Sequence, residues 1–231
     1  MNNLCIIPAR LNSKRIKNKN IKLFNNKPII HFAISAALES KLFKKIIVST
    51  DSPVIAKVAK EYGAEIPFMR PQNLADDFTD TKSVICHAIE ECKKINIKFD
   101  YVCCIYPCVP FLKSEDLLNS YKLLQNSDYN FVFPIAEHSS NVQRALLMNE
   151  NNHISSLFPN NADRRTQDLQ KTYYDAGQFY WGHKKTWSMK LNIHNNAKGY
   201  IIPQIRAKDI DNENDWINAE LFYNYYQNKN Q

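Results

Sequence analysis

A basic loop directly after the first apolar run of the chain carries the residue types that hold phosphate. Six lysines and arginines lie between positions 10 and 22, and Ser13 adds a hydroxyl. A triphosphate needs backbone N–H groups, hydroxyls and cations gathered at the end of a strand. Arg10, Lys14 and Lys19 supply the positive charge. Composition alone fits a solvated or RNA-contacting loop equally well, so the spacing has to decide.

A group of carboxylates lies near the C-terminus, at Asp209, Asp211 and Asp215. Side chains two residues apart in an extended chain point the same way, so Asp209 and Asp211 can face one Mg²⁺ directly or through water. Mg²⁺ keeps several waters and accepts one or two carboxylates together with substrate phosphates. Asp215 instead suits the first turn of a following helix. The alternative for all three carboxylates is helix capping alone.

Charge and cysteine patterns argue against other kinds of site. The net charge of +7 comes from the basic loop and from scattered lysines, which do not form the continuous basic stripe of a nucleic-acid-binding surface. The six cysteines include no CxxC pair, so we expect buried, reduced thiols in a cytoplasmic protein. No targeting segment is expected, and no apolar run approaches the roughly 20 residues that span a bilayer. We therefore expect no nucleic-acid and no membrane partner.

Short apolar runs alternate with helical patterns, and this order predicts an α/β fold with a mainly parallel sheet. Continuous apolar runs predict buried strands, and a 3.6-residue period predicts the helices between them. The expected strands are Asn3–Ile7, Lys45–Ser49 and Tyr101–Ile105, and the expected helices are Ile29–Ser40, Ser52–Tyr62, Lys82–Ile95 and Ser114–Gln125, the last with Ser114 as N-cap. Ligands bind beyond the carboxyl ends of the strands in such sheets. The basic loop is therefore expected at the ligand-binding edge.

The pattern loosens over residues 134–173, which are polar and rich in asparagine. We interpret this segment as an excursion from the core, a β-ribbon or an oligomerisation arm. Residues 1–133 together with 174–231 are then expected to form the catalytic core. Returning strands are predicted at Gln178–Trp181 and Tyr200–Ile202, and a final helix at Glu213–Gln227.

The basic loop resembles the signature of the CMP-sialic acid synthetase family, which is roughly A-R-x-x-S-K-x-x-x-x-K-N. The matching pairs here are Ala9-Arg10, Ser13-Lys14 and Lys19-Asn20. Many members have glycine in the first half of the loop, where this chain offers Asn12 and Asn18 as the residues best able to take a positive φ. It is neither a Walker A motif nor a GxGxxG loop. The resemblance implies a Rossmann-like nucleotidyltransferase fold that binds CTP.

The same resemblance assigns roles to the residues of the loop. Arg10 and Lys19 would hold the triphosphate and act in catalysis as pyrophosphate leaves. The other nucleotide-binding residues that it implies in this loop are Asn12, Ser13, Lys14 and Asn20. Asn20 would lie near the cytosine or the ribose.

The segment from Arg70 to Thr79 matches the family pattern R-P-x-x-L-A-x-D-x-T. There the arginine and the backbone near Leu74 and Ala75 are implied to recognise cytosine, with Thr79 in the same site. Cytosine offers O2 and N3 as acceptors and an amine as donor. Arg70 can satisfy the acceptors and a backbone carbonyl the amine.

Two further matches concern the metal and the sugar. Asp209-Ile210-Asp211 resembles the family's D-I-D element, which implies Mg²⁺ at Asp209 and Asp211 with Asp211 catalytic. Tyr106 stands where sialic acid synthetases usually show glutamine, and residues 173–182 look like the pseudaminic acid branch. An aromatic wall with a few polar groups suits a less polar sugar. The expected sugar-binding residues are Tyr106, Arg165, Gln167, Tyr174, Asp175, Gln178 and Tyr180.

Together these patterns predict a cytidylyltransferase that uses CTP and Mg²⁺ to activate a nonulosonic acid, with pseudaminic acid as the first candidate. The resemblance also implies a homodimer whose excursion completes the partner's sugar site. The same reaction on legionaminic acid, N-acetylneuraminic acid or Kdo is an alternative. A non-catalytic nucleotide- or RNA-binding module is another, but it leaves Arg70, Asp209 and Asp211 without a role.

Overall fold

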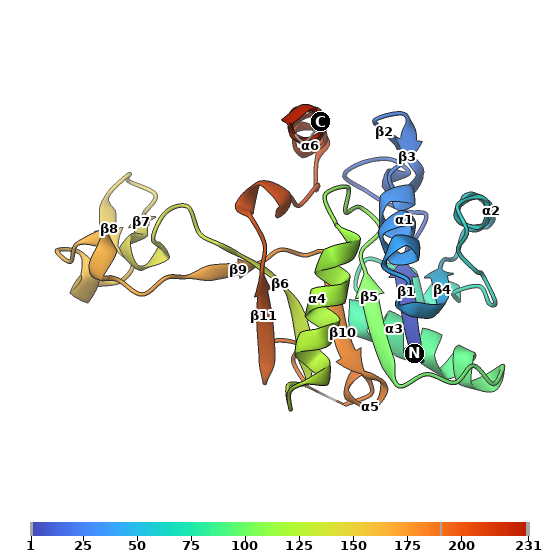
Figure 1. Ribbon diagram of the computed structural model, residues 1–231. Coiled ribbons are helices and arrows are strands. Elements are labelled where there is room, and N and C mark those ends of the chain that lie inside the picture. Colours follow the sequence, from blue (N-terminus) through green and yellow to red (C-terminus); the bar gives the residue numbers. More distant parts are fainter. Residues whose placement is uncertain (1, 190, 230–231) are drawn as a thin grey trace.

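A seven-stranded sheet forms the centre of the computed structural model, which describes residues 2–189 and 191–229 (Figure 1). The strand order is β11-β6-β10-β5-β1-β4, with β9 paired to β6. The strands are β1 Asn3–Pro8, β4 Phe43–Ser49, β5 Tyr101–Ile105, β6 Phe131–Glu137, β9 Tyr173–Asp175, β10 Phe179–His183 and β11 Ala197–Ile201. β1 is parallel to β4 and β5, and β6 to β11, whereas β10 runs antiparallel between β5 and β6. The predicted α/β fold class is confirmed.

Helices cover both faces of this sheet. They are α1 Ile30–Ser40, α2 Pro53–Glu61, α3 Thr81–Lys94, α4 Ser114–Gln125 and α5 Lys184–Trp187. A further helix, α6 Glu213–Lys229, packs in a separate apolar cluster that includes Phe24. Because side chains alternate along a strand, Cys5 and Ile7 pack with α1, α2 and α4, while Leu4 and Ile6 pack with α3 and α5. The two layers hold the sheet rigidly and leave its carboxyl-end edge open for a site. None of the helices in the described ranges combines the length and the apolar character needed to cross a bilayer.

Two local details differ from the sequence-based expectations. Strand β6 is not predicted, because Pro134 lies inside it and cannot donate to a ladder. The carbonyl of Pro134 accepts from the Ala176 amide, in the turn between β9 and β10, so the missing N–H falls where the ladder is already interrupted. Helix α4 begins at Ser114, but Lys113 is its N-cap. The Asp116 carboxylate accepts the Lys113 amide at 3.1 Å, which places the cap one residue earlier than predicted.

The chain leaves the sheet after β6 and returns at β9. Between them, the hairpin of β7 (Leu146–Met148) and β8 (Ile154–Ser156) projects from the core (Figure 1). Four of its apolar side chains are exposed: Leu146, Leu147, Met148 and Ile154. A smaller hairpin, β2 (Leu23–Phe24) with β3 (Lys27–Pro28), follows the basic loop.

Candidate active site

A cleft of about 470 Å³ opens at the carboxyl ends of β1, β4 and β5. Its walls come from the basic loop after β1, residues 70–81 before and at the start of α3, residues 106–108 after β5, Gly177, and the pair Asp209 and Asp211. Gly177 reaches the same edge because β10 is antiparallel, so this strand begins where its neighbours end. The position is the one expected for a ligand of a mainly parallel sheet.

The two ends of the basic loop are joined by Asn20. Its amide nitrogen donates to the Arg10 carbonyl at 2.8 Å, and its amide oxygen lies 3.4 Å from the Cys108 thiol. Burial raises the pKa of that thiol to about 12, so Cys108 stays protonated and can donate. Asn18 takes the expected positive φ, 52°, and precedes a 3-10 turn over Lys19–Ile21. Asn12 neither has a positive φ nor lines the cleft.

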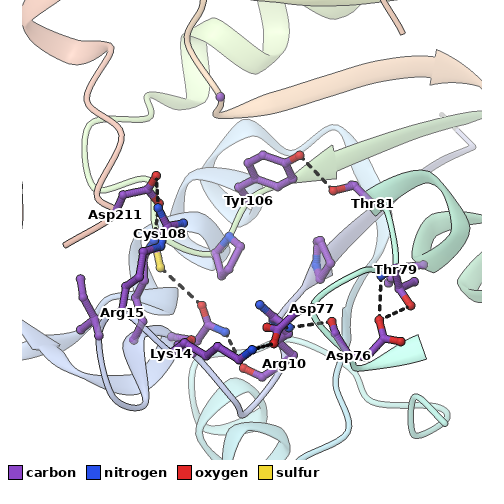
Figure 2. Close-up of a pocket in the computed structure, with 18 of the residues that line it drawn as sticks. Arg10, Lys14, Arg15, Asp76, Asp77, Thr79, Thr81, Tyr106, Cys108 and Asp211 are labelled. Carbon is purple, nitrogen blue, oxygen red and sulfur yellow. Dashed lines mark hydrogen bonds and ion pairs between the residues drawn. The ribbon is translucent and has the colours of Figure 1, made fainter. Parts of the chain in front are cut away.

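The cations of the loop are paired with carboxylates on two sides of the cleft (Figure 2). Asp77 contacts Arg10 at 2.6 Å and also pairs with Lys14. Asp211 contacts Arg15 at 2.7 Å and Lys19 at 3.7 Å. Hydrogen bonds from Lys14 and Arg10 hold the pKa of Asp77 below its usual range. A polyphosphate that enters the cleft therefore has to replace these carboxylates as the counter-ion.

Arg70 lies at the back of the cleft and is almost completely buried, with 5% of its surface exposed. Its Nε donates to the Ser49 hydroxyl at 3.2 Å, and its guanidinium also donates to the Ser49 carbonyl. Burial lowers the pKa of Arg70 to about 10, so the group remains charged at neutral pH. These bonds fix a cation beside the end of β4, where a base with carbonyl acceptors can meet it.

The loop that follows Arg70 is shaped by Asp76. Its carboxylate accepts hydrogen bonds from the amides of Phe78 and Thr79, at 3.0 and 2.7 Å, and from the Thr79 hydroxyl at 2.6 Å. Leu74 and Thr79 line the cleft, as expected for the nucleotide site, whereas the Ala75 side chain is buried and is not part of its lining.

Asp209 and Asp211 both face the cleft, while Ile210 between them is buried in the core beneath α6. Burial and the charge of Asp211 raise the pKa of Asp209. Two carboxylates that share a partly desolvated space match the oxygen ligands that Mg²⁺ takes. Within the described ranges no three His, Cys, Asp or Glu side chains are grouped to hold a metal ion, so further ligands would be phosphates and water. The residues present fit a magnesium ion that binds with its substrate.

Asp215 does not share this role. Its carboxylate accepts the amides of Asp211 and Asn212, at 2.9 and 3.0 Å, and so caps the start of α6. The Asn212 side-chain oxygen in turn accepts the Asp215 amide at 3.0 Å. This reciprocal pair fixes the chain directly after Asp211.

Among the residues expected to bind sugar, Tyr106 lines the cleft and its hydroxyl lies 3.0 Å from that of Thr81 (Figure 2). Its ring packs edge-on against Tyr180, at 5.6 Å between centroids. The Tyr180 hydroxyl donates to Asp175 at 2.9 Å, and Asp175 also accepts the Gly177 amide at 2.8 Å. Tyr180 and Asp175 therefore support the wall from behind instead of lining it.

The remaining sugar candidates are not brought into this cleft. Gln178 is 1% exposed, and its amide donates to the Arg206 carbonyl at 2.6 Å. Tyr174 packs against His138. Arg165 and Gln167 lie on the projecting segment, where Arg165 pairs with Asp168 at 3.3 Å. In one chain, only Tyr106 of the expected sugar-binding residues lines the cleft.

Arg15, Asp77, Thr81 and Cys108 line the cleft without having been predicted to do so. A signal existed for Asp77, which is the aspartate of the R-P-x-x-L-A-x-D-x-T pattern. The contacts of Arg15 and Thr81 join segments remote in sequence, and no local pattern predicts them.

Comparison with known proteins decides the family. The sequence profile described as cytidylyltransferase matches residues 4–215, which is most of the chain. The chain belongs to this family. It is therefore a nucleotidyltransferase, and the interpretation as a non-catalytic RNA-binding module is set aside.

Individual relatives are consistent with this membership. A pseudaminic acid cytidylyltransferase of Campylobacter jejuni serotype O:2 is 38% identical over 96% of this chain and 97% of its own length. A CMP-N,N'-diacetyllegionaminic acid synthase of Legionella pneumophila is also 38% identical, but over only 52% of each chain. Among solved structures, a CMP:2-keto-3-deoxy-manno-octonic acid synthetase complexed with CTP superposes with a TM-score of 0.72 over 98% of this chain and all of its own, at 12% identity. That likeness supports the nucleotidyltransferase fold.

Proposed function

We propose that the protein transfers the CMP group of CTP to pseudaminic acid and releases pyrophosphate. The observation that carries the proposal is the cleft itself, which brings the cations of the basic loop, the buried Arg70 and the pair Asp209 and Asp211 to one edge of the sheet. The near full-length similarity to a pseudaminic acid cytidylyltransferase supports the choice of sugar, because the legionaminic acid relative matches over half the chain.

In this reaction a hydroxyl oxygen of the sugar forms a bond to the α-phosphorus of CTP. The bond from that phosphorus to the bridging oxygen of the β-phosphate breaks, and the hydroxyl proton passes to water. Arg10 and Lys19 neutralise the charge that develops on the leaving pyrophosphate, and Arg70 holds the base. Most of the rate enhancement comes from position and charge, as in other phosphoryl transfers.

Asp209 and Asp211 would hold Mg²⁺. When bound there, the ion neutralises phosphate charge and makes a nearby hydroxyl more acidic. Arg15 and Lys19, which contact Asp211, keep this carboxylate in place until a metal and a nucleotide arrive.

The sugar lies against Tyr106 in this proposal. The Tyr106 ring presents an apolar face to the sugar. The hydrogen bond between its hydroxyl and that of Thr81 restricts the rotation of the side chain. Arg165 and Gln167 would reach the sugar from a second copy of the chain, because they do not line the cleft of their own chain. The protein would act as a homodimer that associates through the projecting hairpin β7–β8.

The test is a pyrophosphate-release assay with CTP, Mg²⁺ and a panel of pseudaminic, legionaminic, N-acetylneuraminic acid and Kdo. Release is expected with pseudaminic acid above all, and Asp211→Asn is expected to abolish it. Glu213→Gln is the matched control, since it removes one carboxylate charge from the first turn of the same helix, where Glu213 pairs with Lys22 and neither residue lines the cleft. Undiminished turnover in Asp211→Asn would remove the metal role, and equal turnover with another acid would refute the sugar assignment.

A further inference from the structure

Three buried polar side chains hold the segment that leads to Asp209 and Asp211. Arg206, Asp116 and Gln178 are exposed by 7%, 2% and 1%. The Arg206 guanidinium donates twice to the Asp116 carboxylate, one of the bonds being 3.1 Å from Nη2 to Oδ1. Gln178 donates to the backbone carbonyl of Arg206 at 2.6 Å. We refer to these three residues as the polar latch.

Stability alone does not account for the polar latch. Burying an ion pair costs desolvation that the attraction often only balances, and well-packed apolar side chains of similar volume are frequently as stable. Gln178 adds a second cost, because its amide oxygen has no hydrogen-bond partner among the described residues. A polar arrangement that gains little stability still fixes a backbone in one conformation.

The latch joins three segments that build the cleft. Asp116 lies in the first turn of α4 and accepts the Lys113 amide, which ends the loop that carries Tyr106 and Cys108. Gln178 follows Gly177, a residue of the cleft wall. Arg206 precedes Asp209 by three residues. Each partner of Arg206 therefore adjoins a segment that forms another wall of the same cleft.

The metal-facing segment is held on its other side as well. Ile210 is 1% exposed and packs in the apolar cluster with Phe24 and Trp216, and Asp215 bonds to the Asp211 amide at 2.9 Å. The two carboxylates are thus suspended between the latch and the cap of α6. If the latch is weakened, the segment stays anchored at its C-terminal end. Its distance from the basic loop is then no longer fixed.

We propose that Arg206, Asp116 and Gln178 are positioning residues for the two carboxylates. They fix Asp209 and Asp211 opposite the basic loop, and thereby set the affinity of the site for a divalent metal. The inference rests on the proposed function, which assigns the metal to these carboxylates. It also gives Gln178 a role other than sugar binding.

Two variants test the latch without removing a charge. Gln178→Met deletes the bond to Arg206 together with the unpartnered oxygen, so the melting temperature should change little. Arg206→Lys keeps the charge but cannot make the paired guanidinium contact. Thr186→Val is the control, since Thr186 is a buried polar residue on α5 rather than in the cleft wall. Mn²⁺ binding is measured by electron paramagnetic resonance with CTP present, and Michaelis constants for CTP and sugar are measured in parallel.

Mn²⁺ binding about tenfold weaker in both latch variants, with the control unchanged, is expected because supporting partners of metal ligands typically contribute on that scale. Unchanged Mn²⁺ affinity in both variants would overturn the proposal, even if Asp211→Asn is inactive and the proposed function stands. A Gln178→Met protein with a raised Michaelis constant for the sugar alone would also overturn it. Failure of the proposed function is visible separately, as absence of pyrophosphate release from the unaltered protein with every acid.

Discussion

The four cations of the basic loop that line the cleft each contact a carboxylate of the same chain. Arg10 and Lys14 share Asp77, and Arg15 and Lys19 share Asp211. Nucleotide binding is therefore an exchange of anions and not the filling of a bare positive site. The free protein keeps its phosphate-binding side chains in place at the cost of some affinity for the phosphate.

Asp77→Asn should strengthen CTP binding, because it removes the anion that competes for Arg10 and Lys14. Exposed ion pairs are weak, so a gain of roughly two- to fivefold in affinity is expected. Since the released cations stay exposed, CTP affinity should also fall more steeply with salt. Titration calorimetry at several NaCl concentrations measures both effects.

The control for this variant is Glu213→Gln. Glu213 pairs with Lys22 at 2.5 Å, but neither residue lines the cleft, so CTP affinity should not change. Weaker CTP binding by Asp77→Asn would mean that Asp77 supports the loop instead of competing with the triphosphate.

The sequence predicts the residues that line the cleft better than those that support them. Arg10, Ser13, Lys19 and Arg70 are recognisable because phosphate and base require particular side chains at set spacings. Gln178 is an example of a residue whose surroundings the sequence does not predict. The sequence pattern suggests that it faces the sugar, whereas its amide donates to the Arg206 carbonyl. Support of this kind depends on segments far apart in sequence, which no local pattern reveals.

At the scale of elements, the central strands are predictable because they are buried on both faces and read as continuous apolar runs. β1, β4 and β5 are of this kind. β6 is missed because its proline breaks the pattern. Pro134 is tolerated because it lies between the parts of β6 that pair with β10 and with β9, where no ladder bond needs its N–H. The start of β11 at Ala197 is earlier than predicted, since the first residues of this edge strand are less apolar.

Close packing along β10 gives a stability prediction. A Cβ at Gly182 would lie 2.8 Å from the Phe131 ring and 2.9 Å from the indole nitrogen of Trp187, two side chains with no room to move. Gly182→Ala should lower the free energy of unfolding by about 1–3 kcal/mol, as overpacked cores do. Urea denaturation measures the loss.

Gly199→Ala in β11 is the comparison for this variant. Its Cβ would clash with Ile135 Cδ1 and lie 2.9 Å from Ile135 Cγ1, but this side chain is only partly buried and can shift toward solvent. The smaller loss is therefore expected there. Equal losses in the two variants would show that packing around β10 is not tighter than around β11.

The projecting hairpin gives a prediction about association. Met148 pairs with Ile154 and Leu146 lies two residues away, so these three apolar side chains share one face and are 69%, 64% and 64% exposed. Met148→Asp should convert the proposed dimer to a monomer, because a charge in an apolar contact loses its water. Ser155→Asp places the same charge on the opposite face and should leave the dimer intact. Sedimentation velocity distinguishes the two, and a wild-type monomer would refute the dimer.

At the scale of the molecule, the cleft and the projecting segment have different proposed roles. In the proposed function the nucleotide site lies within one chain, since the basic loop, Arg70 and the pair Asp209 and Asp211 all line one cleft. The proposed sugar site would need a second chain, because Arg165 and Gln167 lie on the projecting segment and do not line the cleft. Binding of the two substrates should therefore protect different segments of the assembly from hydrogen exchange.

Hydrogen exchange can separate these two responses. CTP with Mg²⁺ should slow exchange in residues 9–21 and 70–81, which form the nucleotide wall, and leave residues 157–170 unchanged. Pseudaminic acid without CTP should slow exchange in 157–170, since Arg165 and Gln167 would contact it from the partner chain. In the Met148→Asp monomer the CTP effect should persist and the sugar effect should vanish. Equal protection of 157–170 in monomer and dimer would place the sugar contact within one chain, and no protection in either would remove both residues from the sugar site.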